Sequence, residues 1–486
     1  MKTEKKIIQN VIEDNPIQKR CNFLERFYLG INYANVVFVA RYLGNISEFQ
    51  IQNAIMKLQI HHPLLRCRIY FDKENTPYFT SKLVNPIPFT YSIKSDNFDW
   101  KVQSIKEYSY QFCNNNDPLI RFSVFQSKKI SETSEIILVG QHSICDGLSL
   151  AYLIDELFDY LGNMNIIPNP LPLHPGICRE SIPDNVKVGK LSKFFVKKIN
   201  KRWENEKIGF TQSDYEILHK NLAKNFNYEC IFSQLSQVST KRLINECKNH
   251  NISVNSAIIT AFQSAILYSE NRYLDYHKRI ALAVGCRDRY KIPAKKSVGL
   301  FISSQDYILK YDQTRTFWEN AKIFHKKISQ KLTDQQLFSK MLVSEMLDLS
   351  IVDAIHFKLF ASQISPDFSK NLKIKDFLQR QDIISKFIKM KKMKGINHGV
   401  LISNLGKIQY KEAYGDLKLT DVHFLPPSGG SHEKVLGIIT HEGKLNIALS
   451  FQLDVISLKN MENFEQIFRE ILEFKQDPLF YAKISL

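Results

Sequence analysis

Several features that define common classes of protein are missing from this sequence of 486 residues. None of its 8 cysteines forms a CxxC pair, which argues against a zinc knuckle or a thioredoxin-like site and favours reduced thiols. No stretch approaches the roughly 18 apolar residues of a membrane-spanning helix. The N-terminal segment lacks the apolar core of a signal peptide and carries early acidic residues, so we expect a cytoplasmic protein.

Acidic residues are fewer than basic residues. The chain has 66 lysines and arginines against 49 aspartates and glutamates, a net charge of +17. Such an excess favours an anionic partner, which could be nucleic acid, a membrane surface or a phosphorylated co-substrate. A zinc finger, an aromatic RNA-binding signature and a compact basic stripe are all missing from the sequence, so we expect no nucleic-acid partner.

The apolar pattern predicts a mixed α/β protein, and the length predicts two domains. Strand patterns occur at 33–43, 64–71, 119–126, 135–140, 279–286, 299–308, 434–440 and 445–451. Helix patterns occur after Ser47 and at 147–160, 254–269, 314–331 and 460–474. Four prolines within 168–175 suit a crossover rather than a helix. We therefore expect an N-terminal domain at 1–165, a linker at 166–225 and a C-terminal domain at 226–486.

The stretch QHSICDG, residues 141–147, stands where a strand pattern ends and a helix pattern begins. Only one histidine of the chain, His142, has an aspartate four residues after it. A neutral imidazole at a strand end can take a proton from a hydroxyl or amine that attacks a carbonyl. Gly147 allows a tight turn and keeps bulk away from a cleft. His142 is therefore a candidate general base.

The residues between His142 and Gly147 allow alternatives. Asp146 could orient the imidazole or hold the loop, and its place before the helix pattern favours the loop, as a helix cap. A purely structural interpretation stays open, with Asp146 only a cap and His142 an ordinary strand-end residue. Cys145 could be a nucleophile, but a buried, inert thiol is favoured.

The same stretch resembles the HHxxxDG motif of the condensation-domain-like, coenzyme-A-dependent acyltransferase superfamily. Residues 23–43 are similar to the opening of its alcohol O-acetyltransferases, and further similar segments follow in the family's order at 61–69, 117–125, 284–290, 297–303 and 402–408. The resemblance implies two chloramphenicol-acetyltransferase-like domains, each with a mixed sheet and flanking helices. It also implies an active-site tunnel between them.

The resemblance implies roles for single residues. His142 matches the family's general base. Asp146 matches a structural aspartate that pairs with an arginine of the second domain, for which Arg287 is the best match and Arg289 the rival. Gln141 replaces the first histidine of the motif, so the packing of the loop can differ from that of the family.

Two further sets of residues are candidates for a functional role. Gln141 and Asn404 are candidates for substrate contacts, and a turn role before Gly406 is an equal alternative for Asn404. His61 and His62 are adjacent, but Arg66 follows four residues after His62 where an acid would be needed. We interpret this histidine pair as residues at a helix end.

Taken together, the resemblance predicts an acyltransferase that moves an acyl group from acyl-CoA to the hydroxyl of an alcohol. Acyl-CoA would be a co-substrate, no metal or cofactor would be bound, and the protein would be a monomer. One alternative is a condensation-type enzyme with a carrier-protein thioester as donor or an amine as acceptor. Another is a catalytically silent module that binds a lipid or a protein. The retained His142, Asp146 and Gly147 favour catalysis, and the lack of a fused carrier region favours CoA.

A basic segment at 190–203 has an amphipathic helical pattern. Its apolar face consists of Leu191, Phe195, Val196, Ile199 and Trp203, and its basic face of Lys190, Lys193, Lys197 and Lys201. The favoured interpretation is a surface helix whose apolar face packs on the protein. The alternative is peripheral contact with an anionic membrane, to which a second basic run at 386–394 would add charge.

Overall fold

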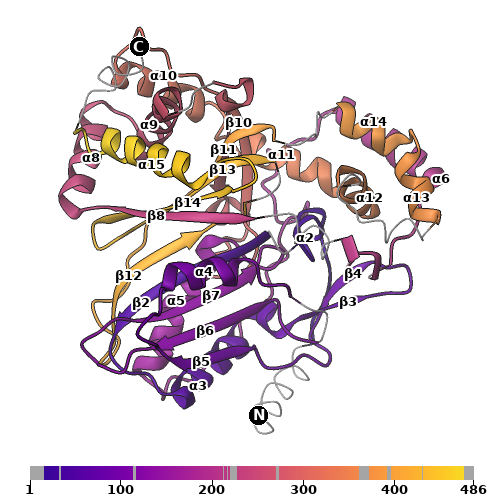
Figure 1. Ribbon diagram of the computed structural model, residues 1–486. Helices are drawn as coiled ribbons and strands as arrows, with labels where there is room; N and C mark the ends of the chain where they lie inside the picture. Colours follow the sequence, from indigo (N-terminus) through magenta and orange to yellow (C-terminus); the bar gives the residue numbers. More distant parts are fainter. Residues whose placement is uncertain are drawn as a thin grey trace.

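The computed structural model describes residues 16–31, 34–112, 116–211, 213–215, 217–218, 227–269, 273–360, 372–390, 396–428 and 431–475. It confirms a mixed α/β fold with two bodies, each a sheet covered by helices (Figure 1). The lower body in Figure 1 is built mostly from the N-terminal half and the upper body from the C-terminal half.

The N-terminal sheet has five strands. In spatial order they are β12 (Lys418–Leu425), β2 (Asn35–Leu43), β7 (Ser134–Gln141), β6 (Ile120–Gln126) and β5 (Phe89–Ile93). One face of β2 packs Val36 and Phe38 into the main core, with α3 (Glu48–His61) and α5 (Gly147–Gly162). The other face packs Val37 and Val39 against α4 (Trp100–Tyr108) and the C-terminal sheet. Burial on both faces explains the unbroken apolar run of this strand.

The C-terminal sheet has six strands. In spatial order they are β10 (Ile302–Ile308), β9 (Arg279–Gly285), β11 (His398–Lys407), β13 (His432–His441), β14 (Lys444–Gln452) and β8 (Tyr228–Leu235). β11 runs parallel to β9 and β13, whereas the other neighbours are antiparallel. Its core includes residues of α8 (Gln237–Asn249), α9 (Val254–Ser269), α10 (Phe317–Ser329) and α15 (Leu458–Leu472).

The length and apolarity of the helices determine whether any of them could span a membrane. Within the described ranges, no single helix is long and apolar enough to span a bilayer. α8 and α9 have the length and apolarity of a span only when they are taken together, and they are bent by 104° to one another.

One strand does not follow the predicted domain boundary. β12 belongs to the C-terminal half of the sequence but pairs antiparallel with β2, with Val422 opposite Ala40. Val422 and Phe424 join the N-terminal core, so burial of their side chains explains the exchange. The predicted C-terminal domain at 226–486 therefore contributes this strand to the N-terminal sheet.

One predicted strand also needs correction. The predicted strand at 64–71 begins as a short 3-10 helix, Pro63–Arg66, and only β3 (Arg68–Phe71) is extended. β3 joins β4 (Pro77–Thr80) and β1 (Gln18–Arg20) in a small separate sheet. Within the predicted linker 166–225, the expected basic amphipathic helix is present as α6 (Lys190–Glu206), and its Trp203 is fully buried.

A group of helices lies beside the two sheets. Its members are α2 (Phe23–Tyr28), α6, α11 (Asp334–Glu345), α12 (Ser350–Leu359), α13 (Leu372–Gln379) and α14 (Ile383–Met390). Figure 1 shows α12 between α2 on one side and α13 and α14 on the other. Trp203, Phe357 and Phe377 form part of a core shared by α6, α12 and α13.

Candidate active site

A cavity of about 860 Å³ lies between the two bodies and is lined by residues of both. The N-terminal side contributes residues of α2, β2 and the loop that joins β7 to α5, including Tyr28, His142 and Gly147. The C-terminal side contributes residues of β9, β10, β11 and α12. The motif predicted from the sequence therefore faces a cavity at the junction of the domains.

His142 follows the last residue of β7 and is held by its neighbours. Its backbone amide donates to the carbonyl oxygen of Ala34 at 3.0 Å. Its Nδ1 lies 2.8 Å from the carbonyl oxygen of Cys145, and a carbonyl can only accept, so Nδ1 carries the proton. Nε2 then keeps its lone pair. The ring of Tyr28 packs against the imidazole with 4.4 Å between centroids.

Burial decides the charge of this imidazole. His142 is 5% exposed, and desolvation lowers its pKa below the usual 6.5, although the Cys145 carbonyl and Asp146 act in the opposite direction. The imidazole is therefore neutral at neutral pH. A neutral ring with a free Nε2 on a cavity is the form that a general base requires.

Asp146 turns away from His142 and caps helix α5. Its Oδ1 accepts from the backbone amide and the hydroxyl of Ser149, both at 2.8 Å. The same Oδ1 lies 2.5 Å from Nη2 of Arg287, and Oδ2 accepts from the amide of Phe301 at 3.1 Å. Of the two roles open to Asp146, the geometry shows the one that holds the loop.

Arg287, rather than its rival Arg289, forms the ion pair across the domains. Its Nη1 donates to the carbonyl oxygens of Lys295 and Ser297 at 3.0 and 2.7 Å. Its guanidinium also lies 4.8 Å from the ring centroid of Phe301. Arg289 instead pairs with Asp334 at 2.8 Å, nearer the surface.

Ser149 is a member of this network that the sequence reasoning missed. Its hydroxyl oxygen accepts from Nη2 of Arg287 at 2.6 Å and lies 2.9 Å from the carbonyl oxygen of Gly299, which shares the single hydroxyl proton with Asp146. In the sequence, this role is indicated by the position of Ser149 three residues after Asp146, which is the N3 position of a capping box. The cap of α5 and the contact between the domains are therefore built from the same atoms.

The other residues of the motif are structural. Cys145 is fully buried, its thiol contacts the carbonyl oxygen of Gln141, and desolvation raises its pKa well above the usual 9.0. The thiolate is thus strongly disfavoured. The side chain of Gln141 accepts a hydrogen bond from the hydroxyl of Ser143 at 2.8 Å. Gln141 is not among the described residues that line the cavity. The proposed substrate contact of Gln141 therefore lacks support from the structure.

Asn404 lies at the cavity and also has a role in the turn before Gly406. It lines the cavity, and its Oδ1 accepts from the amide of Gly406 at 2.8 Å. Gly406 has a positive φ of 74°, which a residue without a Cβ adopts readily. The turn thus fixes Asn404 at the cavity wall.

A second polar group lies on the cavity wall formed by the C-terminal sheet, and the sequence did not reveal it. His398 Nε2 lies 3.3 Å from Asp306 Oδ1, and the rings of His398 and His432 are 5.1 Å apart. Burial lowers the pKa of His432 to about 3, so this ring is neutral. These residues come from three different strands, and only the pairing of β11 with β13 brings the two histidines into register.

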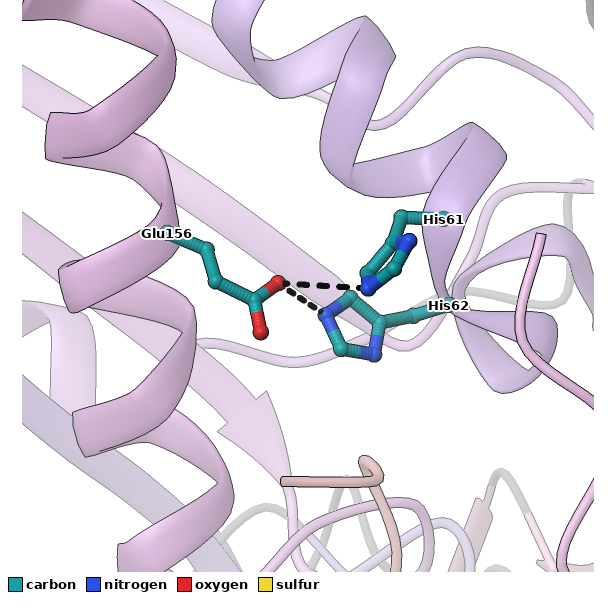
Figure 2. A group of neighbouring side chains, drawn as sticks. All are labelled: His61, His62 and Glu156. Carbon is teal, nitrogen blue, oxygen red and sulfur yellow. Dashed lines mark hydrogen bonds and ion pairs between the residues drawn. The ribbon is translucent and has the colours of Figure 1, made fainter. Parts of the chain in front are cut away.

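His61, His62 and Glu156 form a cluster away from the cavity lining (Figure 2). His61 is the last residue of α3 and His62 its C-cap, so the interpretation as helix-end residues is confirmed. Nε2 of His62 lies 2.7 Å from Glu156 of α5, and Nε2 of His61 lies 3.9 Å from the same carboxylate. Two imidazoles and a carboxylate are donors of the kind that bind divalent metals. Here His62 and Glu156 already bond to each other, so two of the three donors are occupied. Their contact joins the end of α3 to α5, the helix that Asp146 caps.

Gly147 is required for space rather than for a special backbone conformation. It is the first residue of α5 and is not among the glycines with positive φ. A Cβ at this position would lie 2.6 Å from two ring atoms of Phe424 and 2.8 Å from a methyl carbon of Leu405. The expected tight turn is therefore not the reason for the glycine. Its lack of a side chain lets β12 pack against the start of the helix.

Gly147→Ala should lower the free energy of unfolding by about 1–3 kcal/mol, the usual effect of overpacking. It should also reduce turnover, because Phe424 and His142 line the same cavity. Thermal unfolding and initial rates would test this. Phe424→Leu in the same protein should restore part of the stability, since it removes ring atoms that the new methyl group meets. No restoration in the double variant would contradict the steric explanation.

Comparison with known proteins shows which family part of the chain resembles. The condensation-domain family matches residues 8–166, the part that carries the His142 motif. No curated protein matches the chain significantly.

Solved structures match nearly the whole chain at low sequence identity. Trichothecene 15-O-acetyltransferase TRI3 from Fusarium sporotrichioides is 11% identical with a TM-score of 0.62, over 95% of this chain and 96% of that one. The first condensation domain of the CDA synthetase is 11% identical with a TM-score of 0.59, over 95% and 97%. The epimerization domain of the third module of tyrocidine synthetase B is 12% identical with a TM-score of 0.56, over 96% and 93%.

These matches confirm the resemblance that was predicted from the motif. Residues 8–166 are similar in sequence to the condensation-domain family. Nearly the whole chain shares its two-domain fold with an O-acetyltransferase and with a condensation domain.

Proposed function

We propose that the protein is an acyltransferase that moves an acyl group from acyl-CoA to the hydroxyl of an alcohol. The observation that carries the proposal is the neutral imidazole of His142, which is fixed through Nδ1 and lies on a cavity between two domains. No residue of a bound metal or cofactor site is needed for this chemistry. Acyl-CoA enters as a co-substrate.

The proposed reaction uses one base and no covalent enzyme intermediate. Nε2 of His142 takes the proton of the acceptor hydroxyl as its oxygen attacks the thioester carbonyl. The tetrahedral intermediate collapses, the carbon–sulfur bond breaks, and the thiolate of CoA leaves. The proton on Nε2 then neutralises the thiolate, and the imidazole returns to its starting form. The buried, protonated thiol of Cys145 takes no part.

Groups for binding the donor and the developing oxyanion are available around this base. Gly147 lies on the cavity at the first position of α5, where backbone N–H groups have no partner within the helix. Such donors suit an oxyanion. Arg279 and Lys331 line the same cavity and suit the phosphates of CoA.

The choice of an alcohol and of CoA rests on the resemblance of residues 23–43 and on the fold shared with an O-acetyltransferase. Condensation domains of peptide synthetases share the fold as well. A carrier-protein thioester as donor, or an amine as acceptor, is therefore the second candidate.

The test is product analysis by mass spectrometry. The purified chain would be given mixed acyl-CoAs with a panel of alcohols and amines, and in parallel an acyl-carrier thioester. We expect esters from the CoA donors and their loss in His142→Ala. Amides, or product only from the carrier thioester, would replace this proposal by the second candidate. No product under any condition would favour the silent binding module.

A further inference from the structure

The outer face of α6 is unlike an ordinary surface helix. Leu191, Phe194 and Phe195 are 75%, 62% and 57% exposed. The rings of the two phenylalanines lie 5.9 Å apart, so the three side chains form one apolar patch on the first turns of the helix. We define the α6 outer face as this patch together with the basic residues of the same helix.

The opposite face of α6 attaches the helix to the protein. Val196 and Trp203 are buried, and Nε1 of Trp203 donates to the hydroxyl of Ser350 at 2.9 Å. At about 100° per residue, Phe194 points roughly 160° away from Val196. The single apolar face predicted from the sequence is therefore divided. Its later part packs on α12, whereas Leu191 and Phe195 stay in solvent with Phe194.

Positive charge surrounds this patch. α6 carries five lysines and one arginine against two glutamates. Its one internal ion pair joins Arg202 to Glu206 at 2.8 Å, and among the residues that the structure describes the five lysines form none. α14 lies against α6, where the amide of Ile383 donates to Glu206, and it adds exposed Lys386 and Lys389. Met390 at its end is 66% exposed.

We propose that the α6 outer face docks on an anionic lipid bilayer. Exposed phenylalanines gain stability when they enter the apolar part of an interface, and lysines around them gain from the negative headgroups. A soluble polyanion would satisfy the lysines but would leave the three apolar side chains in water. The combination of both kinds of residue on one helix therefore favours a lipid surface.

The position of α6 relates this surface to the cavity. α12 contacts the α6 and α14 layer, and its residues His356 and Leu359 line the cavity together with Phe360, its C-cap. Figure 1 shows these helices together at one side of the molecule. Docking through α6 would hold the cavity near the bilayer, where an apolar acceptor is concentrated. The proposal goes beyond acyl transfer and can be tested without turnover.

Co-sedimentation of the full chain with vesicles tests it. Vesicles of phosphatidylcholine alone would be compared with vesicles that also contain phosphatidylserine, at low and high salt. We expect salt-sensitive binding to the anionic vesicles only. Lys193→Glu, Lys197→Glu and Lys201→Glu together should weaken it by roughly 10²-fold or more, since each near-surface cation contributes about fivefold.

A second variant tests the apolar patch. Leu191→Ser with Phe194→Ser should weaken binding at unchanged charge, because both side chains are already exposed and their loss leaves the core intact. Phe49→Ser is its matched control, since Phe49 is 69% exposed on α3 of the N-terminal body. Lys101→Glu, Lys106→Glu and Lys128→Glu together form the control for charge.

The outcomes separate the possible surfaces. Circular dichroism would first show that each variant is folded, and His142→Ala should bind vesicles as the unchanged protein does. No binding to anionic vesicles at low salt would overturn the proposal. Equal losses in the α6 variants and their controls would overturn it as well. Binding to heparin without binding to vesicles would assign the lysines to a soluble polyanion instead.

Discussion

His142→Ala should lower turnover by about 10²–10⁴-fold, the usual contribution of a positioned general base. The fold should stay intact, because the imidazole makes one side-chain hydrogen bond to the described residues, to the Cys145 carbonyl, and a bond of this kind contributes about 1 kcal/mol. Single-turnover rates and thermal unfolding of the same preparation would measure both effects. Full turnover in the variant would remove His142 from the mechanism.

The pH dependence provides an independent measurement of the same residue. The base acts in its neutral form, and desolvation lowers the pKa of His142 below the usual 6.5. The acid limb of kcat/KM should therefore lie below pH 6.5, with a flat profile from there to neutral pH. An acid limb above pH 6.5 would contradict the buried, neutral imidazole.

Cys145→Ala is the control for the neighbouring nucleophile. The thiol lies behind the cavity wall, and its raised pKa keeps it protonated. Turnover should change by no more than a few-fold, through packing alone. Loss of activity in Cys145→Ala with activity retained in His142→Ala would reverse the two roles.

The local elements could be predicted because each one carries its own periodic pattern. The helix at 254–269 was predicted with the bounds it has, and the strands around His142 were displaced by only one or two residues. His142 and Asp146 could be found because a strand end, a helix cap and a glycine follow one another within seven residues. Their resemblance to a known motif then indicated the arginine partner.

Features that depend on distant pairing could not be predicted in this way. β12 has the pattern of any half-buried strand, and nothing in that pattern tells which sheet it joins. Asp306, His398 and His432 meet only because β10, β11 and β13 belong to one sheet, in which β9 separates β10 from β11. On α6, periodicity showed which residues share a face. It could not show that Trp203 finds a partner in α12 while Leu191 finds none among the described residues.

The ion pair between the domains should have the largest effect on stability. Asp146 and Arg287 are 2% and 5% exposed, and their closest atoms are 2.5 Å apart. Removal of one partner leaves the other charge buried and unpaired, at a cost of roughly 3–5 kcal/mol. Asp146→Ala should therefore lower the midpoint of unfolding, and turnover should fall with it because the loop of His142 is held by the same contacts.

Arg289→Ala is the matched control, because the two arginines are close in sequence and differ in burial. The side chains of Arg289 and its partner Asp334 are 38% and 32% exposed, and ion pairs of this kind contribute about 0–1 kcal/mol. Arg287→Ala with Asp146→Ala should cost less than the sum of the single changes, because neither charge is then left alone. Denaturant unfolding of the five proteins measures these differences. If Asp146→Ala lost activity at unchanged stability, its carboxylate would act on His142 rather than on the domain contact.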